Sequence, residues 1–395
     1  MKLLLKLFSG IIAGIIVGSI YYFSADGTTF HSIMEIVTRL FITMQSILGS
    51  FIFFLIPLII FFFIADGVSS IGRGAGKVVG ATIGVAYIST IGAGLLAFVV
   101  AKFLMPIVTK GGQIQEEGTE LGPLLEFDIP APLDILTALV LAFSVGIVIN
   151  IIKAETMKQW IHDGKQVVEF LIEKVVITIL PFYIAGVFAG MASTGTVFKT
   201  LSVFGVVLLI AILLHWTWIT VQYTIAGSLL GKNPFNMIKT MLPAYVTALG
   251  TMSSAATISV TLPKAKEMGV RDKIADFVIP LGANVHLSGS AITITSCSIA
   301  VMSVLPEYDT PGMLKMIGFV LLIGVVMVAA PGVPGGAVMA ASGILVSHLG
   351  FNEAAVALMI ALYMAQDSFG TAANITGDGA IAGIIDAYDQ NLSKK

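Results

Sequence analysis

Long runs of hydrophobic residues recur along the chain, each long enough to cross a lipid bilayer. The eight runs are 4–23, 33–64, 78–103, 135–152, 167–191, 197–230, 274–305 and 354–385. A transmembrane helix needs about 20 mostly apolar residues, so the second run should be tilted or project from the membrane. Pro181 should interrupt the fifth run. The pattern predicts an all-α polytopic membrane protein with eight spans.

Two further apolar segments are broken near their middle by small and polar residues. One reads TALGTMSSAATISVTLP from Thr247, and the other reads VAAPGVPGGAVMAASG from Val328. Their apolar arms are too short to cross separately, so each predicts a re-entrant helical hairpin. Irregular backbone at membrane depth is tolerated only where it is buried in protein or lines a cavity. Because each hairpin precedes a full span, we expect an inverted repeat with the binding site at its interface.

The last span carries polar side chains that are costly at bilayer depth. Asp367, Thr371, Asn374 and Asp378 are separated by 4, 3 and 4 residues, which places them on one face of a helix. A charged side chain there costs at least about 2.5–3.5 kcal/mol, so it normally faces a cavity, a partner or an ion path. The stripe predicts a site for a transported solute or ion. The alternative is a hydrogen-bonded seam that only joins helices, which suits two carboxylates poorly.

Composition supports the membrane assignment. The 395 residues are 57% hydrophobic and 11% charged, whereas soluble domains are about 25% charged. The net charge of −2 indicates no polyanionic partner, and the single cysteine, Cys297, excludes an intrachain disulfide framework. The N-terminal run resembles a signal peptide without a convincing cleavage site, so we expect a retained first span. Its glycines should allow close helix approach: Gly10, Gly14 and Gly18.

Charge placement predicts the orientation in the membrane. With eight spans and both termini cytoplasmic, 16 of the 21 Lys and Arg residues fall on the cytoplasmic side. This places the mouth of the first hairpin inside and that of the second outside, in a plasma membrane or cell inner membrane. The acidic stretch 108–134 is expected to be a solvated loop. His215, Trp216 and Trp218 are interpreted as aromatic residues of the membrane interface.

These motifs together resemble the dicarboxylate/amino acid:cation symporter family, the glutamate-transporter-like proteins. The matching segments are TMSSAAT (251–257) in the first hairpin, GVPGG (332–336) in the second, and NITGD (374–378) on the eighth span. The resemblance covers essentially the whole chain. It implies a homotrimer with eight spans, two opposed hairpins and an elevator-type mechanism.

The same resemblance divides the chain into a scaffold and a transport core. Residues 1–230 would be mainly scaffold, with spans 3 and 6 packing against the core, and 231–395 would be the core. The core segments are hairpin 1 at about 234–270, span 7 at about 272–305, hairpin 2 at about 312–348 and span 8 at about 352–388.

Site roles follow from the resemblance residue by residue. Asp367 would accept the substrate α-amino group with Thr371 and the Val333 carbonyl, while Asn374 and the first hairpin tip would hold the α-carboxylate. The implied substrate contacts are Ser253, Ser254, Ser290, Val333, Gly335, Asp367, Thr371 and Asn374, with Gly370 and Met252 affecting specificity. Asp378 would bind a cation such as sodium with carbonyls of Gly282, His286 and Asn374. No cofactor beyond a sodium ion or proton is expected.

Two departures from the family pattern change the expected substrate and ion. Carriers of acidic substrates have an Arg where this chain has Gly370, so an acidic side chain would be buried unpaired. On the seventh span, Asn-Met-Asp-Gly-Thr is replaced by HLSGS at 286–290, which removes side chains for a deep sodium ion. His286 either serves only as a hydrogen-bonding residue or carries a proton, and both interpretations stay open.

The leading hypothesis is therefore a symporter of a small neutral amino acid or related carboxylate, driven by protons or by fewer sodium ions. The main rival is a sodium-coupled carrier of dicarboxylates, acidic amino acids or other carboxylates. A channel or a transport-dead sensor is a more remote alternative. Ser288, His286 and Asp367 form a Ser/His/Asp set on paper, but neither G-x-S-x-G nor HExxH occurs, so no enzyme is predicted. The expected partners are the substrate, lipid and copies of the chain, not nucleic acid.

Overall fold

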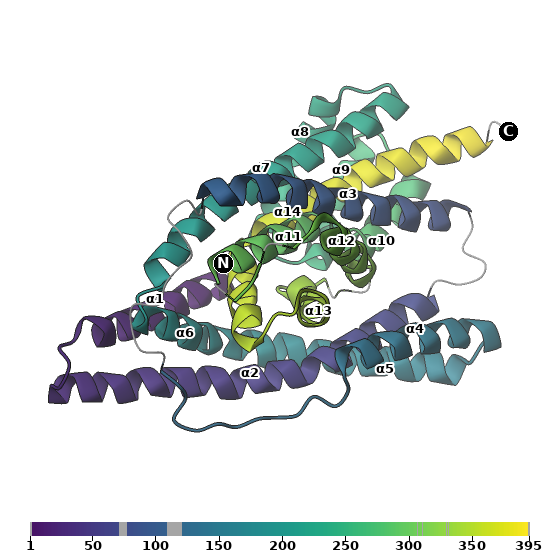
Figure 1. Cartoon of the computed structure of the whole chain (residues 1–395). Helices are drawn as coiled ribbons and strands as arrows, with labels where there is room; N and C mark the ends of the chain where they lie inside the picture. The colour runs from purple at the N-terminus through teal and green to yellow at the C-terminus, as the bar shows by residue number, and fades with distance from the viewer. Residues whose placement is uncertain are drawn as a thin grey trace.

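The computed structural model describes residues 2–70, 77–108, 121–305, 307–309, 311–328, 330 and 332–393, and within these ranges it is helical without strands (Figure 1). In chain order the helices are α1 (Lys2–Phe23), α2 (Thr29–Ser70), α3 (Lys77–Val108), α4 (Ile135–Ile152), α5 (Glu155–Leu171), α6 (Ile177–Ser193), α7 (Val197–Leu230), α8 (Pro234–Thr251), α9 (Ser254–Glu267), α10 (Asp272–Val285), α11 (Ser288–Val304), α12 (Met313–Met327), α13 (Gly336–Ile344) and α14 (Glu353–Ser393). The π-helical turns η1 (Ile172–Val176) and η2 (Leu345–Leu349) follow α5 and α13.

Seven helical stretches of the described chain are long and apolar enough to cross a membrane, and α4 is a shorter apolar helix. The all-helical membrane architecture is confirmed, while the number of eight spans stays a prediction. At 42 residues α2 is about 63 Å long, about twice the thickness of the hydrocarbon core. This length agrees with a long second span, and its tilt or projection from the membrane stays a prediction.

The expected interruption of the fifth span at Pro181 is wrong. Helix continues from Glu155 to Ser193 through η1, and Pro181 lies inside α6. Proline removes one N–H donor, but membrane helices tolerate this where local π-type adjustments satisfy the freed backbone groups. Here the irregular turn lies at Ile172–Val176, ahead of the proline, and the helix begins twelve residues before the predicted start at 167.

The glycines of the first span allow α1 to lie directly on α6, as predicted. A side chain on Gly10, Gly14 or Gly18 would meet the backbone of α6 at Pro181, Ala185 or Ala189, respectively. Figure 1 shows α1, α2 and α6 running alongside one another, with α4 and α5 against one end of α2.

Both predicted hairpins form as pairs of helices, while their re-entrant and opposed placement in the membrane stays a prediction. In the first, α8 and α9 join at Met252, which adopts a left-handed conformation (φ 53°), and Ser253. In the second, α12 and α13 join through the GVPGG segment. The division into scaffold and core stays a prediction, although α3 packs on α11 and α12, and α7 packs on α11 and α14.

The seventh span was predicted to be one continuous helix, but the structure divides it into two helices, α10 and α11. The helical conformation ends at Val285 and resumes at Ser288, with His286 and Leu287 extended or irregular between them. Parts of the orientation and loop predictions cannot be compared with the structure, because their residues lie outside the described ranges. These are Arg73, Lys110, Glu116, Glu117, Glu120, Lys394 and Lys395.

Candidate functional site

The polar stripe of the last span lies inside the protein. α14 is unbroken from Glu353 to Ser393, and Asp367, Thr371, Asn374 and Asp378 are all buried on it. The four side chains serve two adjacent sites. The first three line a small cavity, while Asp378 contacts the break between α10 and α11.

The cavity lies where the two hairpin tips meet α11 and α14. Its lining residues are Met252, Ser254, Leu287, Ser290, Gly332, Val333, Ala337, Tyr363, Asp367, Thr371 and Asn374. The tips touch directly, since the Ser253 hydroxyl donates to the Gly332 carbonyl at 3.0 Å. The remaining space of about 10 Å³ admits roughly one water molecule. The two hairpin tips therefore meet beside a cavity that has little free space.

Asp367 is the charged member of this lining. One carboxylate oxygen accepts the backbone N–H of Gly335 at 2.8 Å, and the other lies 3.4 Å from the Thr371 hydroxyl. Gly335 has φ 74°, a left-handed conformation that favours glycine, and a side chain there would meet Met364. No Lys or Arg appears in the described lining, so the carboxylate has the chemistry to receive an ammonium group.

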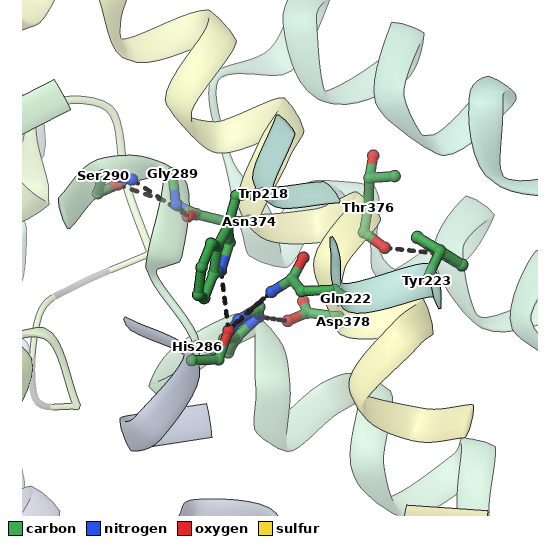
Figure 2. Close-up of polar contacts among 10 residues, drawn as sticks. Trp218, Gln222, Tyr223, His286, Gly289, Ser290, Asn374, Thr376 and Asp378 are labelled. Atoms are coloured by element: carbon green, nitrogen blue, oxygen red, sulfur yellow. Dashed lines mark hydrogen bonds and ion pairs between the residues drawn. The ribbon is translucent and has the colours of Figure 1, made fainter. Parts of the chain in front are cut away.

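Asn374 caps the helix that follows the break in the seventh span. Its Oδ1 accepts the N–H groups of Gly289 at 2.7 Å and Ser290 at 3.2 Å, and its Nδ2 donates to the Ser290 hydroxyl at 3.0 Å (Figure 2). The first N–H groups of a helix have no partner within that helix. An amide from α14 satisfies two of them at the start of α11, which holds the broken span against the cavity.

Asp378 forms a fully buried pair with His286. The imidazole Nδ1 lies 2.9 Å from Oδ1, while Oδ2 has no partner within the described chain. Two glycines make room for the pair. A Cβ on Gly282 would lie 2.9 Å from Oδ1, and one on Gly377 would lie 2.7 Å from the imidazole Cε1. The backbone N–H of His286 itself bonds to the Gly282 carbonyl at 2.9 Å.

The other side of the imidazole is held by α3 and α7. Nε2 lies 3.0 Å from both the Ser89 hydroxyl and the Gln222 amide nitrogen. Ser89 also accepts from Gln222 at 2.7 Å and from Trp218 Nε1 at 3.2 Å. Figure 2 shows Trp218 and Gln222 converging on His286 from α7. The amide nitrogen of Gln222 faces the imidazole Nε2 of His286. With the amide in this orientation, the imidazole Nε2 accepts a hydrogen bond and the imidazole Nδ1–H donates to Asp378.

The prediction that His215 is an interfacial aromatic residue is wrong, whereas the membrane positions of Trp216 and Trp218 stay predictions. His215 is 1% exposed, and its Nε2 lies 3.0 Å from the Gly289 carbonyl and 3.1 Å from the Thr293 hydroxyl. Trp218 donates to Ser89, and Trp216 packs on Tyr245 of the first hairpin. Long amphipathic aromatics suit both an interface and a buried hydrogen bond, and composition does not separate the two.

A larger cavity of about 370 Å³ lies away from this stripe. It is bounded by α2, α6, the start of α7, the end of α11 and the start of α14, including Leu358. Leu358 precedes Asp367 by about 14 Å along the axis of α14. The larger cavity therefore shares no described residue with the polar stripe.

Comparison with known proteins identifies the family. The model of the sodium:dicarboxylate symporter family matches residues 3–388. This chain belongs to the sodium:dicarboxylate symporter family. The predicted resemblance is thereby confirmed, and the protein is a multi-pass membrane protein of a symporter family.

The relatives of this chain include transporters whose names indicate different amino acid substrates. Excitatory amino acid transporter 1 of Ambystoma tigrinum is 31% identical over 210 residues, covering 52% of this chain and 37% of that protein. The protein of the same name from Homo sapiens is 28% identical over 214 residues, covering 54% and 39%. The serine/threonine transporter SstT of Acinetobacter baumannii (strain SDF) is 30% identical over 272 residues, covering 64% of each. The matched part thus spans less than two thirds of each relative.

Most residues predicted to contact substrate gather at the cavity. Met252, Ser254, Ser290, Val333, Asp367, Thr371 and Asn374 line it. Ser253 and Gly335 lie beside it, bonded to a hairpin tip and to Asp367. Gly370 is not in the lining, because its Cβ position faces Thr293 and Gly289 of α11. The roles of these residues stay predictions.

The sequence interpretation missed residues at both the cavity and the His286–Asp378 pair. Tyr363 lines the cavity and donates to the Ser290 hydroxyl at 3.0 Å, and it precedes Asp367 by four residues on the same face. Extending the polar stripe by one turn could have found it. Gln222 and Tyr223 of α7 reach His286 and the Thr376 carbonyl, respectively. No local pattern signals those contacts.

Proposed function

We propose that this protein is a secondary active symporter of a small neutral amino acid or related carboxylate, coupled to a cation gradient. Family membership supports symport, and the names of the relatives support an amino acid as substrate. The observation that carries the choice of substrate is the charge of the cavity. It combines one carboxylate with hydroxyl, amide and apolar groups, and its described lining has no basic side chain.

This charge pattern favours a zwitterion over an acidic amino acid. Asp367 can pair with an α-ammonium group, and the Asn374 amide can donate to an α-carboxylate. A second carboxylate on the substrate would be buried without a cationic partner, which costs several kcal/mol. A side chain at position 370 would point at α11, because the Cβ position lies 3.3 Å from the Thr293 hydroxyl. Among the described residues no Lys or Arg lines the cavity in place of the absent Arg.

The coupling ion is proposed to be a proton, or fewer sodium ions than acidic-amino-acid carriers use. The supporting observation is that the His286 imidazole lies on Asp378, the predicted cation ligand. A protonated imidazole would supply a positive charge there, whereas sodium would have to share Asp378 through its unpaired Oδ2. The elevator motion, the homotrimer and the cytoplasmic termini are proposed from the family resemblance.

The decisive experiment is uptake into proteoliposomes of labelled serine, threonine, alanine and aspartate, with sodium and proton gradients imposed separately. We expect concentrative uptake of a neutral amino acid and little uptake of aspartate. The variant D367N keeps the shape but loses the charge, so it should reduce neutral amino acid uptake to background. Sodium-driven aspartate uptake that neutral amino acids do not compete with would refute the proposal.

A second candidate function is sodium-coupled transport of a carboxylate that is not an amino acid. The family description, which names dicarboxylates, favours it. Such a substrate lacks the ammonium group that Asp367 is proposed to bind. Uptake of a dicarboxylate that survives D367N, and that neutral amino acids do not inhibit, would support this alternative.

The coupling ion is tested separately with H286Q. If the imidazole carries the coupled proton, this variant should lose proton-driven uptake and the pH dependence of uptake. An unchanged pH dependence would refute proton coupling through His286 and leave the sodium version.

A further inference from the structure

We propose that His215 is a positioning residue for the substrate carboxylate, acting through the peptide between Gly289 and Ser290 and through Asn374. The inference rests on the proposed function, because it places the substrate carboxylate against Asn374. His215 lies on α7, contacts the Gly289 carbonyl near the N-terminus of α11, and is not part of the cavity lining. Its effect on the substrate would therefore be indirect.

The first step is a hydrogen bond from the imidazole to a backbone carbonyl. His215 Nε2 lies 3.0 Å from the carbonyl oxygen of Gly289, which can only accept, so Nε2 carries the proton. Nδ1 is buried and has no partner within the described chain. An unprotonated Nδ1 leaves one weak acceptor unpaired, whereas a protonated one would bury an unpaired charge. His215 is thus held as a neutral donor.

The second step passes through a single peptide unit. The C=O of Gly289 and the N–H of Ser290 belong to one planar trans peptide, so they point in opposite directions. The carbonyl accepts from His215, and the N–H donates to Asn374 Oδ1 at 3.2 Å. The peptide unit is therefore held from both sides, by α7 and by α14. Hydrogen bonds linked in this way polarise one another and strengthen.

The third step fixes which end of the Asn374 amide faces the substrate. Oδ1 accepts two backbone N–H groups, from Gly289 and Ser290, so a flipped amide would place donors against donors. Nδ2 is thereby directed to the Ser290 hydroxyl, which lines the cavity. An N–H₂ group at this position can donate to a carboxylate, and an amide oxygen would repel it.

The close fit of α11 on α14 makes this arrangement sensitive to support from α7. A Cβ on Gly289 would collide with the Gly370 carbonyl and lie 2.7 Å from the Ala373 side chain. The backbone of α11 therefore lies directly on α14. Besides the imidazole, the Thr293 hydroxyl of the same helix reaches the Gly289 carbonyl, at 3.1 Å. Among the described hydrogen bonds, the one from His215 joins the Gly289 carbonyl of α11 to another helix, α7.

The test compares substitutions that differ in where they place a donor. H215F removes the hydrogen-bond donor. The amide nitrogen of H215Q can lie close to the position of the imidazole Nε2, whereas the side chain of H215N is too short to reach it. T217V is the matched control, because Thr217 is exposed on the same helix and bonds only to the Leu213 carbonyl of that helix. Full-length protein is used, with Kd from isothermal titration and KM and Vmax from proteoliposome uptake.

For the best neutral amino acid we expect H215F and H215N to raise Kd and KM about five- to tenfold, with Vmax within about twofold. H215Q should recover to within about threefold of the wild type, and T217V should match the wild type. The corresponding amino alcohol, which has no carboxylate, should bind the wild type more weakly. H215F should change its Kd less than about twofold, because the affected contact is absent.

Equal losses for the amino acid and the amino alcohol would overturn the inference, as would wild-type affinity in H215F or failure of H215Q to exceed H215N. If H215F is not monodisperse after purification, the comparison of H215Q with H215N still decides. If the wild type binds aspartate rather than neutral amino acids, the proposed function is wrong. The variants are then compared on aspartate, whose α-carboxylate tests His215 in the same way.

Discussion

Gly377 tests whether the buried imidazole–carboxylate pair is as tightly enclosed as the structure shows. In G377A the new methyl carbon would lie 2.7 Å from His286 Cε1 and 2.8 Å from the Gln222 amide oxygen. Ordinary carbon contacts are about 3.5–4.0 Å, so the ring or α14 must move by about 0.8 Å. Such a shift weakens the 2.9 Å contact with Asp378 and the 3.0 Å contact with Ser89.

The expected magnitude follows from three contributions. Overpacking costs about 1–3 kcal/mol, and weakening one buried hydrogen bond costs about 1 kcal/mol more. Replacing Gly by Ala in a helix returns up to about 1 kcal/mol. The net expectation is a loss of about 1–3 kcal/mol of stability. The control G205A has nothing within 4 Å of its Cβ position, so it should be neutral or more stable by up to about 1 kcal/mol.

The assay is thermal unfolding of purified protein followed by intrinsic fluorescence, together with proteoliposome uptake. We expect the unfolding midpoint of G377A to lie several degrees below that of G205A, and its uptake to fall by more than about tenfold. Midpoints within about 1 °C of each other and equal uptake would refute the reasoning. In that case the pair would have room to move, and its contacts could not be functionally constrained.

Two further predictions concern helix packing and a buried ion pair. G14L should displace α1 from α6, because its Cβ would meet Ala185 backbone atoms that cannot move away. We expect stability to fall by about 2–4 kcal/mol. Thermal unfolding measures the loss, with G84L as the control because its site is open. R271M removes the 2.6 Å partner of the buried carboxylate of Asp386. Because the Arg271 side chain is 43% exposed, we expect a loss of only about 1–3 kcal/mol. R39M removes a 3.5 Å partner of the half-exposed Glu35 carboxylate and should cost less than about 1 kcal/mol. An R271M midpoint equal to that of R39M would contradict this.

Features set by local spacing were predictable from the sequence. The intervals between Asp367, Thr371, Asn374 and Asp378 follow the helical repeat, and all four are buried on one unbroken helix. The Gly/Pro and Ser-rich breaks predicted both hairpins because such residues end helices and form tight turns. Most of the residues that the family motifs indicated lie at one cavity, and their roles stay predictions.

Features set by distant contacts were not predictable. No Pro or Gly occupies 286–287, so the seventh span reads as one helix; the break is instead stabilised by Asn374, 85 residues away from Gly289. Ser89 and Gln222 reach His286 across 197 and 64 residues, respectively. Neither has a sequence pattern that separates it from the many Ser and Gln residues found in membrane helices.

The two buried carboxylates of α14 connect the proposed substrate with the proposed coupling. Each needs a positive partner, because a lone charge at bilayer depth is costly. The His286 imidazole, 2.9 Å from Asp378, becomes such a partner when it is protonated, whereas Asp367 is contacted among the described residues by neutral donors, including Gly335 and Thr371. A zwitterion would bring an ammonium group for Asp367 and leave its own carboxylate to neutral dipoles at Asn374 and the hairpin tips. An acidic amino acid would add a negative charge that the described site does not balance. Each buried carboxylate is best balanced by one positive charge. A neutral amino acid supplies that charge to Asp367 through its ammonium group, and a protonated imidazole would supply it to Asp378.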